Sequence, residues 1–204
     1  QVPFAEDDDS VLGPTSTSRW SYAASKMVDE FLARAYSSEL GLPLVIFRLF
    51  NTIGPRQSRH YGMVVPRFVK QALHDEPITV YGDGKQSRDF VYVTDVAEAF
   101  LAAAKTKYVG KIYNVGSGKE ISVNLIASII GGDKVNIPKR PGEPDRSLAD
   151  ISKIKTQLNW QPKVSIEDGI NMLLKNINEW KDAPVWTPKT IHEATKIWFR
   201  YLDK

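Results

Sequence analysis

The chain alternates between apolar runs typical of buried strands and amphipathic stretches typical of helices. Leu44 to Phe50 is almost continuously apolar, which favours a strand buried in a parallel sheet. Before it, residues 19–40 carry apolar side chains at helical spacing, and Gly41 and Pro43 end that pattern. Because strands and helices continue to alternate, the sequence predicts an α/β fold.

The same patterns predict the remaining elements. Helices are expected over 64–73, 96–105, 122–130, 150–158, 166–181 and 188–202. Strands are expected over 78–81, 89–93 and 112–115. Surface loops are expected over 5–18, 51–62 and 139–146. Thr94 or Asp95 is expected to cap one helix, and Ser165 with Asp168 forms a capping-box pattern before another.

Composition excludes several classes of function. A formal charge of +3, scattered along the chain, does not indicate a nucleic-acid partner. The chain has no cysteine, so it has no thiolate chemistry, and a reducing, cytoplasmic setting is expected. With only 3 histidines, no metal-ligand cluster is visible. No apolar run approaches the roughly 20 residues that span a bilayer, so no membrane association is expected.

Tyr22 and Lys26 form the most suggestive chemical pair. A spacing of four residues on a helix puts the phenol and the ammonium on one face, one turn apart. A nearby ammonium lowers the pKa of a phenol, and such a tyrosine can exchange a proton with a substrate hydroxyl near neutral pH. The pair alone also fits an exposed contact beside a core stripe.

Three motifs in fixed order give this pair a context. They are Ser21-Tyr22-x-x-Ser25-Lys26, Arg48-Leu49-Phe50-Asn51-Thr52-x-Gly54-Pro55, and Tyr81-Gly82-x-Gly84-x-x-x-Arg88-Asp89-Phe90-Val91-Tyr92-Val93-x-Asp95. From about residue 2 to residue 181 the chain resembles the extended short-chain dehydrogenase/reductase family, in its NAD-dependent nucleotide-sugar epimerase, dehydratase and decarboxylase branch.

The resemblance implies an architecture. Family members begin with a Rossmann half whose glycine-rich turn holds the NAD pyrophosphate. Here the Gly-x-Gly triplets at 82–84 and 116–118 come too late for that role. We therefore expect a C-terminal portion: the end of a Rossmann-type parallel sheet plus a smaller α/β substrate-binding domain, without the N-terminal dinucleotide-binding half. The family's catalytic Ser or Thr would also lie upstream.

The expected domain boundary lies near residue 60. Residues 1–60 would complete the Rossmann domain and carry the Tyr-x-x-x-Lys helix. Residues 61–204 would form mainly the nucleotide-sugar domain, with 85–115 partly returning to the Rossmann sheet.

The resemblance also implies roles at the reacting end. Tyr22 would be the acid/base acting on a sugar hydroxyl, and the reaction would pass through a transient keto-sugar. Lys26 would hold the nicotinamide ribose of NAD, with Thr52 close to the nicotinamide. Asn51 would reach the diphosphate of the nucleotide sugar, although a loop asparagine also commonly caps a turn.

Other residues would hold the nucleotide. Arg88 and Arg140 match the family's diphosphate clamps, and guanidinium forks suit phosphate oxygens. Asp145 would accept a hydrogen bond from a ribose hydroxyl, and Val65 would contact the nucleobase. For isolated loop charges, solvated surface positions are the alternative.

Two alternatives stay open. Arg19, three positions before the tyrosine, resembles an arginine of UDP-glucuronate decarboxylases and would bind a substrate carboxylate, or else it is a surface arginine. A non-catalytic relative that binds nucleotide sugars is the other alternative. The family also implies a homodimer that packs through the Tyr-x-x-x-Lys helix.

Overall fold

The chain has a mixed α/β fold, as expected. The computed structural model describes residues 2–17, 20–57, 63–139 and 143–180. The helices are α1 (Trp20–Leu40), α2 (Val64–Leu73), α3 (Val93–Ala104), α4 (Val123–Ile130), α5 (Ser152–Leu158), α6 (Ile166–Lys175) and the 3-10 helix η1 (Ile177–Trp180). The strands are β1 (Val45–Leu49), β2 (Asn51–Ile53), β3 (Ile78–Tyr81), β4 (Ser87–Tyr92), β5 (Lys111–Val115), β6 (Glu120–Ser122) and β7 (Lys134–Ile137).

The strands form small sheets that are mostly parallel. β1 pairs with β5, β2 with β4, and β3 with β7, each in parallel. Only the β4–β6 pair among the described strands is antiparallel. Parallel pairing requires a crossover between partners, which the intervening helices provide.

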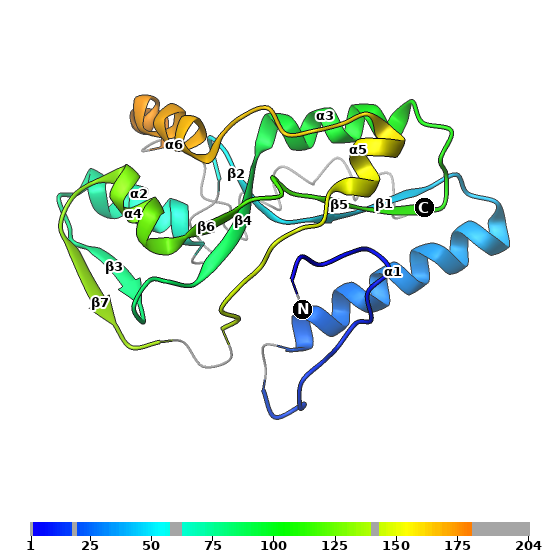
Figure 1. Ribbon diagram of the computed structural model, residues 1–204, viewed down its shortest axis with the longest axis horizontal. Coiled ribbons are helices and arrows are strands. Elements are labelled where there is room, and N and C mark those ends of the chain that lie inside the picture. The colour runs from blue at the N-terminus through cyan, green and yellow to red at the C-terminus, as the bar shows by residue number, and fades with distance from the viewer. Residues whose placement is uncertain (1, 18–19, 58–62, 140–142, 181–204) are drawn as a thin grey trace, which may run out of the picture.

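Helices lie on both sides of the β1–β5 pair. α3 and α5 lie on one side of it, and α1 lies on the other (Figure 1). At the other end of the molecule, α2 and α4 lie beside β3, and α6 packs against α4 (Figure 1). The chain therefore presents two packed regions joined through the central strands.

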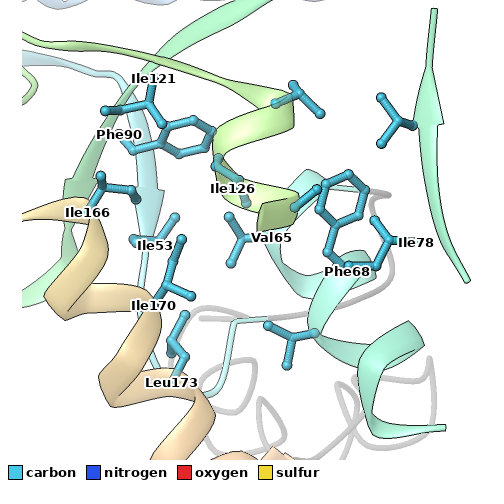
Figure 2. Close-up of a cluster of buried hydrophobic side chains, with 14 of the residues drawn as sticks. Ile53, Val65, Phe68, Ile78, Phe90, Ile121, Ile126, Ile166, Ile170 and Leu173 are labelled. Atoms are coloured by element: carbon cyan, nitrogen blue, oxygen red, sulfur yellow. The ribbon is translucent and has the colours of Figure 1, made fainter. Parts of the chain in front are cut away.

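Each region has its own hydrophobic core. In the larger one, the side chains of Phe68, Ile126 and Ile170 are fully buried and interdigitate between α2, α4 and α6 (Figure 2). The smaller core packs Tyr113 of β5 with Ile154 of α5 and other side chains. These two clusters agree with two packing units, while the predicted boundary at residue 60 stays a prediction.

One of the two predicted helix caps is confirmed. The Ser165 hydroxyl accepts a hydrogen bond from the Asp168 N–H. Ser122, where a helix was expected to start, caps α4 by accepting a hydrogen bond from the Leu125 N–H. The other prediction, Thr94 or Asp95, is wrong. α3 begins at Val93, so both residues lie inside its first turn.

Asp95 has a different structural role. Its buried carboxylate accepts hydrogen bonds from the N–H groups of Lys163 and Val164, both at 3.0 Å. It therefore ties the start of α3 to the segment that leads into α6.

Several other expectations need correction. The short strands β2, β6 and β7 were not predicted, because their hydrogen bonds come from partners elsewhere in the chain. α6 ends at Lys175 rather than at 181, and the helix expected over 188–202 lies outside the described residues. Glu6, expected in a surface loop, is buried and accepts a hydrogen bond from the Asn114 N–H at 2.8 Å.

Candidate active site

Helix α1 presents Tyr22 and Lys26 on one face. The Lys26 ammonium lies 6.0 Å from the centroid of the Tyr22 ring, as their spacing predicts. The Tyr22 side chain is 71% exposed, so a ligand can reach it. Both residues line an open cleft of about 650 Å³ between α1 and β1, together with side chains such as Phe47. The structure thus places the pair at the wall of a cleft.

Asp29 is the ion-pair partner of Lys26. Its carboxylate lies 2.7 Å from the ammonium, and the hydrogen bond from Lys26 to Asp29 raises the pKa of the lysine. Lys26 is therefore positively charged throughout the neutral range. A charged ammonium is the form that attracts a phenolate or donates to ribose hydroxyls.

Arg48 connects β1 to α1 in the same cleft. Its Nε and Nη2 donate to the two carboxylate oxygens of Glu30, at 2.9 and 2.7 Å. Its Nη1 donates to the backbone oxygen of Glu6 at 3.0 Å. Both Arg48 and Glu30 line the cleft that Tyr22 and Lys26 line.

A second cleft, of about 560 Å³, adjoins the first. It is lined by Phe4, Leu49, Phe50, Asn51, Thr52, Gln57, Met63 and Ser147. Leu49 lines both clefts, so the predicted residues Asn51 and Thr52 lie beside the space that Tyr22 and Lys26 face. The Asn51 side chain donates to the Asp89 carbonyl oxygen at 3.1 Å, which orients its amide.

Arg88 lies one strand away from Asn51. Asn51 of β2 is paired with Phe90 of β4, and Arg88 precedes Phe90 by two positions on that strand. The Arg88 guanidinium forms an ion pair with Glu143 at 3.0 Å, and the two side chains are only 13% and 19% exposed. The second carboxylate oxygen of Glu143, Oε2, is buried and has no hydrogen-bond partner among the described residues.

The remaining predicted residues are less closely gathered. Asp145 is exposed and pairs with Lys139 at 2.6 Å, while its backbone oxygen accepts from the Ser87 N–H. Val65 is 1% exposed and packs in the larger core (Figure 2), so its side chain does not face either cleft. This burial speaks against the expected contact between the Val65 side chain and a nucleobase. Arg19 and Arg140 lie outside the described residues.

Sequence reasoning missed Glu30, Arg48 and Glu143. One of these stands in a motif given above, since Arg48 opens the Arg-Leu-Phe-Asn run. Glu143 lies in the loop expected over 139–146, three positions after Arg140. A charged residue inside a mostly apolar strand was the available signal for Arg48, because buried charges need partners. Nothing in the local sequence indicates that Glu30 is that partner.

Comparison with known proteins places this geometry in a family. The sequence model of the NAD dependent epimerase/dehydratase family matches residues 1–116. The chain belongs to this family. A UDP-N-acetyl-alpha-D-glucosaminuronate decarboxylase of Bacillus cytotoxicus is 39% identical to this epimerase/dehydratase-family chain over 191 residues, covering 87% of the chain and 58% of the relative.

Solved structures of family members have the same fold. An epimerase from Methanothermobacter thermautotrophicus superposes with a TM-score of 0.81 at 26% identity, covering 91% of this chain and 58% of its own. A UDP-glucuronic acid 4-epimerase from Bacillus cereus, solved with UDP-glucuronic acid and NAD, has a TM-score of 0.76 at 34% identity, covering 86% and 56%. The chain thus spans between half and two thirds of the length of these relatives.

The described residues fit one end of the family's cofactor, NAD. The exposed Tyr22 and Lys26 can meet a nicotinamide ribose in the α1–β1 cleft. The pyrophosphate end is different. The N–H groups of Ser117 and Gly118 in the second glycine triplet donate to the Asp89 carboxylate, so that loop offers them to no phosphate.

The described residues lack two kinds of feature. None of the helices there is long and apolar enough to cross a membrane. Within the same part of the chain, no group of three or more His, Cys, Asp or Glu side chains is arranged to hold a metal ion.

Proposed function

We propose that the chain is the C-terminal portion of an NAD-dependent enzyme that converts a nucleotide-diphosphate sugar through a transient keto-sugar. The observation that carries this proposal is the meeting of the two clefts at Leu49. Tyr22 and Lys26 line one, and Asn51 and Thr52 line the other. A sugar lying across Leu49 would present a hydroxyl to Tyr22 while its diphosphate extends towards Asn51.

Tyr22 is proposed to act as the acid/base. Its phenolate takes the proton of a sugar hydroxyl, and the resulting phenol later returns it, while Lys26 holds the nicotinamide ribose. The hydride acceptor and donor at the sugar carbon would be NAD, held by Lys26 at its nicotinamide ribose. Thr52 would lie near the nicotinamide, because it lines the neighbouring cleft.

The nucleotide is proposed to lie along the end of β4. Arg88 and Arg140 would bind the diphosphate, and Asp145 would accept from a ribose hydroxyl. The unpartnered Oε2 of Glu143 offers a further acceptor beside Arg88. An acceptor next to a cation suits a ligand that carries hydroxyls close to phosphates.

A homodimer through α1 forms part of the proposal. Along this helix, apolar side chains are half exposed or more; they are Val28, Phe31, Leu32, Tyr36 and Leu40. Exposed apolar stripes of this kind commonly mark contacts with another chain.

Decarboxylation of a sugar acid is the second candidate reaction. The Bacillus cytotoxicus relative named above is a decarboxylase of a uronate sugar. Arg19 would then bind the substrate carboxylate or supply a proton as carbon dioxide leaves.

The complete enzyme tests these proposals directly. UDP-, dTDP-, GDP- and CDP-sugars, UDP-glucuronate among them, would be incubated with the enzyme and NAD while NADH absorbance and product mass are measured. We expect turnover of at least one nucleotide sugar. A product lighter by carbon dioxide identifies a decarboxylase, and an unchanged mass identifies an epimerase. Binding without turnover would instead identify a non-catalytic relative.

A further inference from the structure

Helix α1 has few anchors to the rest of the described structure. None of its side chains is buried there, although the helix is 21 residues long. The polar side chains of Ser25, Lys26 and Ser37 bond within the helix or to the residues just after it. These contacts do not join α1 to β1.

The Arg48–Glu30 pair supplies such a connection. One edge of the guanidinium makes a bidentate contact, since Nε and Nη2 each donate to a different oxygen of Glu30. A fork that grips both oxygens fixes the direction of the carboxylate as well as its distance. The two side chains are 32% and 21% exposed, so water screens this pair less than a surface pair.

Arg48 is itself firmly placed. Its backbone is paired with Asn114 in the β1–β5 register, and Asn114 is buried. The Asn114 side chain donates to the carbonyl oxygens of Phe4 and Asp150. The Glu6 backbone oxygen then accepts from Arg48. The position of the guanidinium is therefore fixed by contacts that do not involve α1.

Glu30 lies on the same stripe of α1 as the reacting pair. Tyr22, Lys26 and Glu30 are spaced by four residues, so they line one face of the helix. All three line the α1–β1 cleft. The bidentate contact from Arg48 to Glu30 therefore fixes the rotation of α1 about its axis and its position along that axis.

We propose that Glu30 and Arg48 are positioning residues, which hold α1 so that Tyr22 and Lys26 face the α1–β1 cleft in reactive orientation. This inference rests on the proposed function for its catalytic consequence. The Arg48–Glu30 contact that holds the helix does not depend on that function.

Kinetics of the complete enzyme test the catalytic consequence. We expect Glu30→Gln and Arg48→Ala to lower kcat by ~10- to 100-fold, the effect of a small misplacement of a reacting group. KM for the nucleotide sugar should stay within about twofold, since binding groups are untouched. Arg48→Lys should recover part of the loss, because an ammonium can still reach one carboxylate oxygen. Glu39→Gln, an equal charge change on an exposed site of α1, is the control and should leave kcat unchanged.

A double-mutant cycle separates positioning from general destabilisation. In a Tyr22→Phe background, Glu30→Gln should lower the residual kcat no further, because residues that act through one another are not additive. An equal loss in both backgrounds, or a normal kcat for Glu30→Gln, would overturn the proposal.

Hydrogen exchange keeps the inference separate from the proposed function. Amides of α1 should exchange at least about tenfold faster in Glu30→Gln than in Glu39→Gln, because a helix that has lost its ion pair with Arg48 opens more often. If the wild-type enzyme turns over no nucleotide sugar, the proposed function is wrong. Hydrogen exchange of the α1 amides then still shows whether the Arg48–Glu30 pair holds the helix. Unchanged exchange in Glu30→Gln would refute it.

Discussion

Arg88 of β4 and Glu143 form an ion pair, with 3.0 Å between Nη2 and Oε1, that joins the strand to the segment following residues 140–142. The pair is largely shielded from water, so each partner depends on the other for charge compensation. A diphosphate that binds Arg88 would meet a guanidinium that is already oriented. Orientation before binding reduces the entropy that a ligand must lose.

Arg88→Ala should weaken binding of the nucleotide sugar by about ten- to hundredfold, since hydrogen bonds to charged groups contribute roughly 1.5–3 kcal/mol. Affinity for NAD should change by less than about twofold. Titration calorimetry on the complete enzyme measures both. Lys85→Ala, which removes an exposed cation just before β4, is the control. Equal losses for the two ligands would indicate a folding defect instead.

Tyr22→Phe should reduce kcat by at least ~10²-fold, because the substitution removes the hydroxyl that exchanges the proton. The ring stays in place, so the fold should be unaffected. Tyr108→Phe is the control, since it removes a phenol that lines neither cleft. Nearly normal turnover in Tyr22→Phe would refute the assignment of the acid/base.

Asp95→Ala should destabilise the chain by about 3 kcal/mol, because it leaves the N–H groups of Lys163 and Val164 without their acceptor. Urea unfolding followed by circular dichroism gives the free energy of unfolding. Asp133→Ala, at an exposed carboxylate, should change it by less than about 0.5 kcal/mol. A loss below about 1 kcal/mol for Asp95→Ala would show that these hydrogen bonds contribute little.

Glu120 should make the free energy of unfolding depend on pH. Hydrogen bonds from Arg146 and then from Ser87 lower the pKa of Glu120 in the folded chain. Because the folded pKa lies below the unfolded one, this contribution is present above about pH 4.3, the ordinary glutamate value, and is lost as pH falls through the folded pKa.

Glu120→Gln tests that dependence. The variant should be less stable than the wild type at pH 7, and the difference should shrink as pH falls below about 4.3. Urea unfolding across this range measures it, with Glu76→Gln at an exposed site as the control. A difference that is constant with pH would exclude an ionic origin.

Elements with local hydrogen bonds were predictable from sequence. The span of α1 was predicted within one residue, since Gly41 and Pro43 end its pattern. Ser165 caps its helix as expected, because a cap uses only the next turn. Strand β7 was missed because its partner β3 lies far away in sequence and its side chains are mostly exposed.

In the candidate site, too, relationships within one helix were predictable, and contacts between separate elements were not. The shared face of Tyr22 and Lys26 follows from helical spacing alone, so sequence sufficed. Glu30, in contrast, is defined by its contact with Arg48, which lies on another element. The expectation for Val65 took no account of burial, and the larger core covers its side chain. Pairings between distant residues were therefore the part that sequence reasoning could not supply.

The parallel pairing of distant strands has a kinetic consequence. Val45 pairs with Lys111, and Ile78 pairs with Lys134, so these two ladders close only after long stretches of chain have been ordered. Loop closure of this kind is entropically costly before any contact offsets it, and high contact order slows folding. Refolding from urea should accordingly be slower than for a helical protein of this size, with local helices such as α1 forming before the ladders.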